Sequence, residues 1–284
     1  MNQLILKSPQ CVMKEFNNLF IELTAKNCNQ RCKYCYIDFP LNKNVRDFIA
    51  VDKIKQALFD TKNENIKCIY LTGAEPMTHP DFNLILRNCL KFSNVCICTN
   101  GSFINEKKAR FIKKVEDECS NEIIFELSIN HYNEIKNDEV RSRGSYRITM
   151  NAIKNLIKYD FNPIICITNF YNEPKDVLIT EFKNIFSKFG FEANDNNFII
   201  NTYHGLNIEN KFSETEKCRF DCEYGRILTS KGIYTCPFLA NDHRGRCGST
   251  FADYSKHNAL ETPYCSTCLK NKEMMFSIDY ELFR

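Results

Sequence analysis

Three cysteines near the amino-terminal end of the chain have a spacing that suits a metal centre. Cys28, Cys32 and Cys35 form the pattern CxxxCxxC within "KNCNQRCKYCY", residues 26–36. They lie too close together to come from separate secondary-structure elements, so the sequence predicts one loop around one inorganic core. Thiolate is the soft ligand that zinc and iron–sulfur clusters prefer.

The two candidate centres differ in the group that completes the ligand set. Structural zinc takes four ligands, so a zinc site here needs a fourth group, for instance His79 or His131. A 4Fe-4S cluster held by three thiolates keeps one iron with a vacant position, where a substrate or cofactor binds directly. The spacing, and Tyr34 directly before the last cysteine, favour the cluster.

The chain has 16 cysteines, many for its 284 residues. In a reducing compartment such a count indicates metal or redox chemistry before disulfides. Some are scattered, mostly in apolar segments where a thiol packs as a small hydrophobe: Cys11, Cys68, Cys89, Cys96, Cys98, Cys119 and Cys166. Others crowd the end of the chain: Cys218, Cys222, Cys236, Cys247, Cys265 and Cys268.

Short apolar strands alternate with longer helical patterns in front of this cysteine-rich tail. Strands are expected at 19–24, 68–72, 95–99, 123–129, 163–168 and 198–202, and helices near 51–61, 81–92, 106–116, 146–159 and 175–189. The alternation predicts an α/β fold, a parallel sheet with crossover helices, as an open sheet or a partial barrel. A hairpin is expected to turn at 230–232, and a boundary near 210 gives the domains 1–210 and 211–284.

Both architectures place function at the carboxyl ends of the strands. Cys28 follows the first predicted strand, residues 73–76 follow the second, Asn100 follows the third and Asn130 follows the fourth. We therefore expect these residues to converge at one edge of the sheet.

The stretch "FIELTAKNCNQRCKYCY" resembles the signature of the radical S-adenosylmethionine (SAM) superfamily, in which SAM supplies the missing ligand of a 4Fe-4S cluster. "LTGAEP", residues 71–76, resembles the GGEP motif of that family, with Ala74 in place of the second glycine. "CTNG" at 98–101 and "LSINHYNEIKNDEVRSRGSY" at 127–146 resemble later family motifs. The resemblance covers residues 17–172 and implies a partial parallel (β/α)6 barrel of the radical SAM type.

The resemblance also implies which residues contact the cofactor. In the family, backbone carbonyls after the second strand bind the SAM amino group, so a side chain as small as that of Ala74 should be tolerated there. Glu75 is expected to help orient that amine. Ser128 and Asn130 fall where ribose contacts are usual, and Arg141 falls where a carboxylate partner is found, although Asn130 replaces the commoner aspartate. The implied set is Tyr34, Gly73, Ala74, Glu75, Pro76, Asn100, Ser128, Asn130 and Arg141.

The cysteine-rich tail resembles the SPASM or shorter twitch extension, which binds auxiliary 4Fe-4S clusters. The full SPASM run CxxCx5CxxxC is absent, so one auxiliary cluster is expected. Its expected ligands are Cys218, Cys236, Cys265 and Cys268, with Cys222 and Cys247 as alternates. The same two alternates are candidate hydrogen-atom donors. Zinc is the other candidate metal here, because CxxC pairs also serve zinc ribbons.

The resemblance implies that SAM is cleaved reductively to a 5'-deoxyadenosyl radical, which abstracts a hydrogen atom from a substrate C–H bond. Flavodoxin or ferredoxin is the expected electron donor. We expect oxidation or other modification of a small polar metabolite, with the auxiliary cluster as electron acceptor. Two alternatives stay open. The first is modification of a peptide or protein side chain by epimerisation, cross-linking or maturation, and the second is a non-catalytic zinc or iron–sulfur module.

The composition does not indicate binding to nucleic acid or to a membrane. The chain is 43% hydrophobic and 26% charged, and its 38 basic and 35 acidic residues leave a net charge of +3, so neither nucleic acid nor membrane binding is expected. No apolar run approaches the roughly 18 residues that span a bilayer. The first residues lack the pattern of a secretory signal, so a cytoplasmic location is expected.

Overall fold

The computed structural model describes residues 10–37, 47–202, 220–260, 262, 264–265, 268 and 275–278. Its main sheet contains a run of parallel strands: β2 (Asn18–Glu22), β3 (Cys68–Thr72), β4 (Asn94–Thr99), β5 (Ile123–Ser128), β6 (Ile164–Asn169), β7 (Phe198–Thr202) and β8 (Gly225–Thr229). The first six agree with the predicted strands to within two residues. The α/β fold class is therefore confirmed.

Antiparallel strands extend the same sheet at one edge: β9 (Gly232–Tyr234), β10 (Arg246–Thr250) and β11 (Asp253–Tyr254). The full order is β11-β10-β9-β8-β2-β3-β4-β5-β6-β7. A separate two-stranded sheet pairs β1 (Gln10–Val12) with β12 (His257–Ala259). The predicted hairpin is present as β8 and β9, but the sequence did not predict that β8 pairs in parallel with β2.

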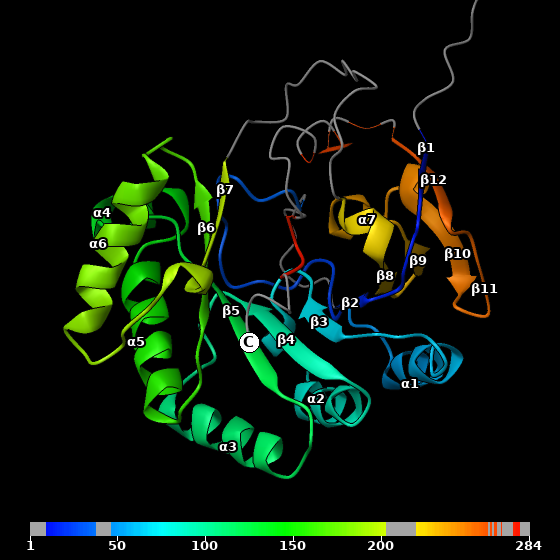
Figure 1. Cartoon of the computed structure of the whole chain (residues 1–284), viewed down its shortest axis with the longest axis horizontal. Coiled ribbons are helices and arrows are strands. Elements are labelled where there is room, and N and C mark those ends of the chain that lie inside the picture. The colour runs from blue at the N-terminus through cyan, green and yellow to red at the C-terminus, as the bar shows by residue number, and fades with distance from the viewer. Residues whose placement is uncertain are drawn as a thin grey trace, which may run out of the picture.

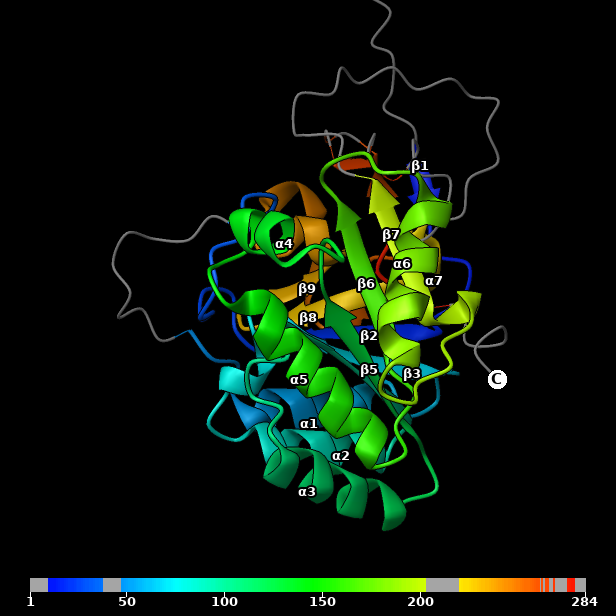
Figure 2. The ribbon, with the colours of Figure 1, turned by 90° about the vertical axis from the view of Figure 1, so that its left-hand side faces the viewer.

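Helices cover the outer face of the curved sheet, as Figures 1 and 2 show. They are α1 (Val51–Asp60), α2 (Phe82–Leu90), α3 (Glu106–Asp117), α4 (Glu134–Val140), α5 (Ser145–Lys158) and α6 (Lys175–Ser187). The short α7 (Asp221–Tyr224) lies apart from them, beside β1 and β8. All five predicted helices are present, and α4 and α7 were not predicted. Short 3-10 turns are η1 (Pro76–Thr78), η2 (Asp195–Asn197), η3 (Pro237–Leu239) and η4 (His243–Gly245).

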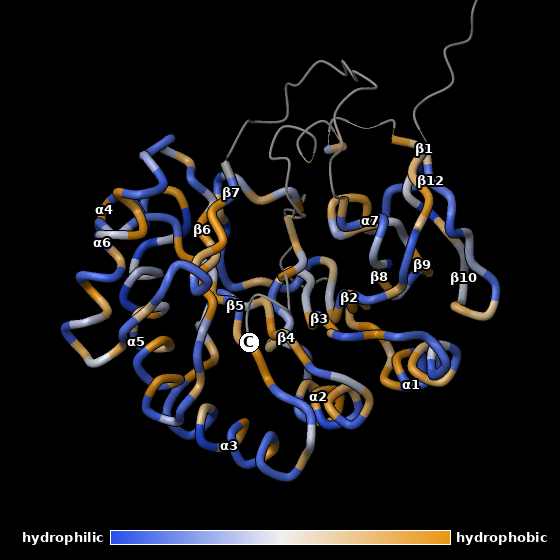
Figure 3. The backbone as a smooth tube through the Cα atoms, viewed as in Figure 1, coloured by the Kyte–Doolittle hydropathy of each residue, from blue (hydrophilic) through white to orange (hydrophobic). Residues whose placement is uncertain are grey.

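The helices form because their apolar residues recur on one face. In α3, Ala109, Ile112 and Val115 are buried against the sheet, and the Asn105 side chain caps the helix by accepting a hydrogen bond from Lys108 N at 2.9 Å. Figure 3 shows hydrophobic colour along the central strands and hydrophilic colour on the outer turns of α3. This packing forms the main core, between the outer face of the sheet and the helices.

The inner face of the sheet carries a second core. Its buried residues are Phe20, Cys68, Tyr70, Cys96, Ile124, Ile164, Ile227, Tyr234 and Ile278. Burial of Cys68, Cys89 and Cys96 confirms the prediction that these thiols pack as small hydrophobes. Among the described helices, none is long and apolar enough to cross a membrane.

Candidate active site

A cavity of about 250 Å³ lies at the carboxyl ends of the parallel strands, above the inner core. Most of the residues that the sequence assigns to a site line it: Cys28, Cys32, Cys35, Tyr34, Gly73, Ala74, Glu75, Asn100, Ser128 and Arg141. Pro76 and Asn130 are buried but are not among the lining residues. The parallel topology therefore brings residues from five parts of the sequence to one hollow.

The three-cysteine loop is held in place by its own backbone and by neighbouring strand ends. Gln30 N donates to Cys28 Sγ at 3.3 Å, and Asn100 Nδ2 lies 3.7 Å from the same sulfur. Cys35 N donates to Cys32 O at 3.1 Å, which closes a turn between these two cysteines. Hydrogen bonds to a ligating sulfur are one means by which a protein tunes an iron–sulfur cluster.

Burial raises the pKa of the Cys28 thiol, and it raises the pKa of Cys35 to about 11. Both side chains are therefore neutral thiols near pH 7 in the absence of metal. A bound metal ion deprotonates its thiol ligands and compensates for the buried charge. Three thiols without a neighbouring disulfide partner on one cavity wall fit a thiolate-ligated metal centre.

Two buried polar atoms on the same cavity have no partner within the described structure. They are Gln30 Nε2 and Arg141 Nη1. The rest of the Arg141 guanidinium donates to Gln30 Oε1, from Nε at 3.2 Å and from Nη2 at 3.0 Å. Because unpaired buried donors cost free energy, this pair fits a ligand that brings an acceptor such as a carboxylate. That is the group which the resemblance to SAM enzymes assigns to Arg141.

Glu75 ties two strand ends together. Its carboxylate accepts from Thr99 Oγ1 at 2.8 Å, from Asn100 N at 2.9 Å and from Met77 N at 3.1 Å. Burial raises the pKa of this carboxyl group, while the three hydrogen bonds favour its charged form. Glu75 therefore positions the ends of β3 and β4, and its contact with a cofactor amine stays a prediction.

Gly73 allows the backbone to pass close to a neighbouring strand end. Its φ is +125°, and a Cβ atom at this position would come 2.4 Å from Thr24 O. Ala74 N donates to the same carbonyl at 2.8 Å. The first glycine of the motif is therefore required by close packing and by its left-handed backbone, whereas Ala74 meets no such demand.

Tyr34 and Asn130 connect the cysteine loop to the far side of the cavity. The Tyr34 hydroxyl donates to Asn130 Oδ1 at 2.6 Å, and Asn130 Nδ2 donates to Thr168 O at 2.6 Å. Asn137 of α4 accepts from Asn130 N at 2.9 Å. In this structure the Asn130 side chain is therefore engaged by the protein, and its ribose contact stays a prediction.

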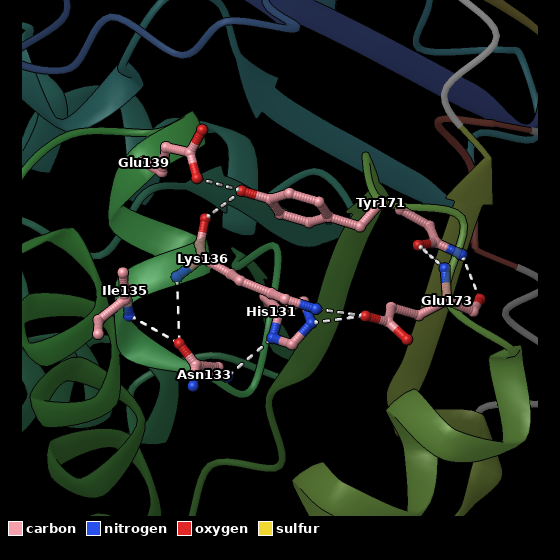
Figure 4. Close-up of polar contacts among 8 residues, drawn as sticks. His131, Asn133, Ile135, Lys136, Glu139, Tyr171 and Glu173 are labelled. Atoms are coloured by element: carbon pink, nitrogen blue, oxygen red, sulfur yellow. Dashed lines mark hydrogen bonds and ion pairs between the residues drawn. The ribbon is translucent and has the colours of Figure 1, made fainter.

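A polar network on the outer side holds α4, whose carboxyl end carries Arg141 (Figure 4). Lys136 Nζ and His131 Nε2 both contact Glu173 Oε1, at 2.6 and 3.3 Å. The Tyr171 hydroxyl contacts Lys136 O and Glu139 Oε2, each at 3.1 Å. Burial lowers the pKa of His131. This network links the loops after β5 and β6.

Neither His79 nor His131 completes a zinc site with the three cysteines. His79 Nε2 contacts Ile49 O at 2.9 Å, its Nδ1 accepts from Asp81 N at 3.0 Å, and His131 is engaged as above. Neither histidine lines the cavity of the cysteine loop. His243 and His257 are exposed, and His204 lies outside the described residues.

A second, smaller cavity of about 20 Å³ collects four thiols from the tail: Cys222, Cys236, Cys265 and Cys268. This donor set fits a metal centre with four thiolate ligands. Cys11 of β1 adds a fifth thiol nearby, with its Sγ 3.4 Å from Cys222 Sγ. Cys218, the predicted fourth ligand, lies outside the described residues. Cys247 lines neither cavity, and its Sγ contacts Thr235 Oγ1 and Gly245 O, each at 3.5 Å.

An aromatic wall, made of Phe238, Tyr264 and Phe276, lines both cavities. The ring centroids of Phe238 and Tyr264 are 5.1 Å apart, and those of Phe238 and Phe276 are 4.6 Å apart. Ser277 and its neighbours are anchored by Asp221, whose carboxylate accepts from Met275 N at 2.8 Å and from Ser277 N at 3.0 Å.

Sequence reasoning missed several residues on the cavity wall, among them Gln30, Cys98, Glu126 and Cys166. Cys98 and Cys166 were expected to pack as small hydrophobes, but both line the large cavity together with Glu126. A carboxylate two residues before Ser128, inside an otherwise apolar strand, was the signal in the sequence. Its position between two thiols could not be predicted, because it depends on the order and register of three strands.

Solved structures share this fold. The protein anSMEcpe with bound AdoMet aligns over 94% of this chain and 82% of its own, with a TM-score of 0.64 and 16% identity. Streptococcus suis SuiB bound to the precursor peptide SuiA aligns over 86% of this chain and 64% of its own, with a TM-score of 0.61 and 15% identity. Likeness at this identity concerns the fold.

Curated relatives are matched over part of their length. A GTP 3',8-cyclase of Clostridium perfringens is 25% identical over 184 residues, which cover 60% of this chain and 53% of the relative. A cysteine-type anaerobic sulfatase-maturating enzyme of Clostridium novyi is 25% identical over 184 residues, which cover 58% of this chain and 48% of the relative. The chain therefore spans about half the length of these relatives.

A model of one family matches residues 23–179, more than half of the chain. This range contains the three-cysteine loop, the Gly73 turn and Arg141. Members of the family use a 4Fe-4S cluster and SAM, in agreement with the cavity described above. The chain belongs to the radical SAM superfamily.

Proposed function

We propose that this protein is an enzyme that uses SAM to abstract a hydrogen atom from a C–H bond of a substrate held in the large cavity. One observation supports this most strongly. Three thiols line the same 250 Å³ hollow as Gln30 and Arg141, and each of these two side chains has a buried, unpaired donor. A thiolate-held cluster and the carboxylate of its SAM ligand would satisfy both at once.

The bound cluster and SAM supply the difficult chemistry, a reductive cleavage that yields a 5'-deoxyadenosyl radical. The protein positions these groups. Cys28, Cys32 and Cys35 would hold the cluster, and Arg141 with Gln30 would bind the SAM carboxylate. The Gly73–Ala74 backbone would receive the SAM amine, and Ser128 would contact the ribose.

The aromatic wall would exclude water from this hollow. Tyr36 packs edge-on against Phe238 with ring centroids 5.3 Å apart, which extends the apolar lining toward the cysteine loop. Exclusion of water protects a reactive radical from side reactions. The same wall lines the smaller cavity, which holds four thiols.

The tail would bind one auxiliary 4Fe-4S cluster through Cys222, Cys236, Cys265 and Cys268. This assignment takes Cys222 in place of Cys218, because Cys222 lines the cavity with the other three. Such a cluster would accept an electron from the substrate and make the net reaction an oxidation. Iron per chain should fall by about four atoms in Cys222→Ala, whereas an unchanged iron content would return the role to Cys218.

The substrate class stays the finer part of the proposal. Oxidation of a small polar metabolite is our first candidate, because the cavity of about 250 Å³ suits a small molecule. Modification of a peptide or protein side chain is the second, supported by the sulfatase-maturating relative and by the SuiB complex with a precursor peptide. Flavodoxin or ferredoxin would supply the electron, and the exposed Arg31 and Lys33 beside the cysteine loop could attract such an acidic partner.

Anaerobic reconstitution with iron and sulfide tests this function. Addition of dithionite and SAM should release 5'-deoxyadenosine and methionine, and Cys32→Ala should abolish the release. Cys119→Ala is the matched control, because Cys119 lies in neither cavity and should not affect turnover. Stoichiometric zinc without SAM cleavage would instead support a non-catalytic metal-binding module.

A further inference from the structure

The floor of the large cavity carries a carboxyl group that the cluster and SAM do not use. Glu126 of β5 lines the cavity between Cys98 of β4 and Cys166 of β6. Cys98 Sγ lies 3.6 Å from Glu126 Oε2, and the Cys166 thiol also hydrogen-bonds this carboxyl group. Below them the inner core, including Cys96, Ile124 and Ile164, closes the floor.

Glu126 has no cationic partner within the described part of the chain. It takes part in no ion pair there, and no Lys, Arg or His contributes to its electrostatic environment. The charge that contributes is that of Asp221, which is negative. A buried carboxylate without a counter-ion is expensive. A ligand that brings a positive charge to the cavity would remove that cost.

Arg141 does not serve as this counter-ion. Two of its nitrogens donate to Gln30, and the third is the unpaired Nη1 that the proposed function assigns to the SAM carboxylate. The cavity thus offers a hydrogen-bond donor at Arg141 and an acceptor at Glu126. SAM accounts for the first and leaves the second for the substrate.

We infer that Glu126 anchors the substrate, and that the group it binds is a protonated amine. The inference rests on the proposed function, since it takes Arg141 as occupied by SAM. Glu126 is on this view a substrate-binding residue of the barrel floor, flanked by two neutral thiols that donate to its other lone pairs. Free metabolites and lysine side chains both carry such an amine, and peptide probes separate these two sources.

A metal ion is the competing occupant of this site. Cys96, Cys98 and Glu126 have ligand atoms within 4.8 Å of one another. Cys96, however, lies in the inner core and does not line the cavity. Three ligands also leave a soft metal ion short of the four that structural zinc takes. These facts favour an amine over a metal ion.

Calorimetry with three probes of similar shape tests the inference by measuring their affinities. The protein is reconstituted anaerobically, and S-adenosylhomocysteine is present. Cyclohexylamine, cyclohexanol and cyclohexanecarboxylate differ only in the polar group. We expect the amine to bind most tightly at pH 8. In Glu126→Gln its affinity should fall at least about 30-fold, as for other buried charge pairs that lose one partner. Glu118→Gln is the control, because it removes an exposed carboxyl group of the same chain. This variant should bind the amine like the wild type.

A second pair of probes identifies the source of the amine. Acetylated pentapeptides with a central lysine or glutamine are compared with cyclohexylamine. Binding of the lysine peptide with the same dependence on Glu126 indicates a side-chain substrate, and binding of cyclohexylamine alone indicates a free metabolite. Glu126→Asp, which keeps the charge, should retain the preference for the amine with weaker affinity, and it guards against misfolding of the amide variant.

Other results overturn the inference. They are a preference for the alcohol or the carboxylate, an amine affinity that Glu126→Gln leaves unchanged, or a zinc or cadmium ion retained by the wild type and lost in Glu126→Gln. SAM cleavage in the absence of any probe is measured separately. If cleavage is absent while the amine binds through Glu126, the proposed reaction fails and the amine site stands.

Discussion

At the scale of single residues, burial changes the titration of the carboxyl groups on the inner side of the sheet. Burial raises the pKa of Glu126 to about 7, against hydrogen bonds from Cys166 and Cys98 that lower it. It also raises the pKa of Glu22 to about 7, against a hydrogen bond from Asn241. Both carboxyl groups bind their protons more tightly in the folded chain than in the unfolded chain.

The pH dependence of stability follows from this direction. Because the folded pKa of Glu126 is raised, its favourable contribution is complete below the unfolded pKa of 4.5 and is lost as the pH rises through about 7. Glu126→Gln removes this loss. Its free energy of unfolding, relative to that of the wild type, should therefore rise by about 2–3 kcal/mol between pH 5 and pH 8.

Urea denaturation at the two pH values measures this difference in ligand-free protein. The exposed Glu118→Gln variant is the control and should follow the wild type at both pH values. The groups that lie near Glu126 or affect its pKa are the same in both proteins: Cys96, Cys98, Cys166 and Asp221. Equal pH dependence in wild type and Glu126→Gln would contradict the assigned burial.

The residues differ in how far the sequence alone could identify them. Cys28, Cys32 and Cys35 share one loop, so their spacing in the sequence is enough to predict that they meet. Glu126 meets Cys98 and Cys166 only through the register of β4, β5 and β6. A side chain whose neighbours come from other strands carries no local signature of its partners.

At the scale of elements, two glycines with left-handed backbones provide a direct comparison. Gly73→Ala places a Cβ atom 2.4 Å from Thr24 O, whereas a Cβ atom at Gly144, which precedes α5, meets nothing within 4 Å. Each substitution should lower the free energy of unfolding by about 1–2 kcal/mol, because alanine disfavours a left-handed backbone. Only Gly73→Ala adds a clash with backbone, so it should lose several kcal/mol more and weaken SAM binding.

Denaturation curves and SAM titrations of both variants measure this effect. Gly144→Ala should lose stability modestly and retain SAM affinity. If the two variants lose equal stability, the close approach between the β3 end and Thr24 does not constrain the turn.

The network around α4 supports Arg141 from outside the cavity. Tyr171→Phe removes the hydroxyl that contacts Lys136 O and Glu139, so the free energy of unfolding should fall by about 0.5–1.5 kcal/mol. Tyr146→Phe is the control, because its hydroxyl makes no hydrogen bond within the described residues. Equal stability of Tyr171→Phe and wild type would show that solvent replaces these contacts.

The same helix shows why some elements escaped prediction. α4 has only seven residues, and its buried side chains are Asn137 and Val140, one polar and one apolar. It therefore lacks the apolar periodicity that predicted α1, α3 and α5. Its Asn133 cap was visible in the sequence, but a cap without a periodic face does not distinguish a helix from a turn.

At the scale of the whole molecule, residues 275–278 return to the interior of the fold. Asp221 accepts hydrogen bonds from Met275 N, Ser277 N and Ser277 Oγ, and Ile278 N donates to the Tyr70 hydroxyl at 3.0 Å. These contacts hold Phe276 in the aromatic wall. Met275 and Phe276 are thus part of the cavity wall.

Asp221→Asn tests this connection. The amide offers one acceptor oxygen where the carboxylate offers two, so we expect a loss of about 2–4 kcal/mol of stability and faster amide exchange at residues 275–278. Asp253→Asn, an exposed change in β11, should alter neither quantity. Unchanged exchange at residues 275–278 would mean that Asp221 does not anchor the segment.

The sheet as a whole was predictable only in part. Apolar strands and crossover helices follow from local periodicity, which is why β2 to β7 agree with prediction to within two residues. The domain boundary near 210 stays a prediction, and β8, which follows it, pairs with β2 over Asn18 to Ile21. That pairing joins distant parts of the chain, and distant pairing leaves no periodic trace in a sequence.

The β2–β8 pairing also affects folding during synthesis, because the two strands leave the ribosome at different times. The ribosome releases β2 early, yet the strand that covers its free edge follows roughly 200 residues later, about 10–40 s at ordinary elongation rates. During that interval the nascent sheet exposes an unpaired, apolar edge of the kind that recruits other chains. Slow translation or crowding of polysomes should therefore favour aggregation of this protein before it is ever loaded with iron.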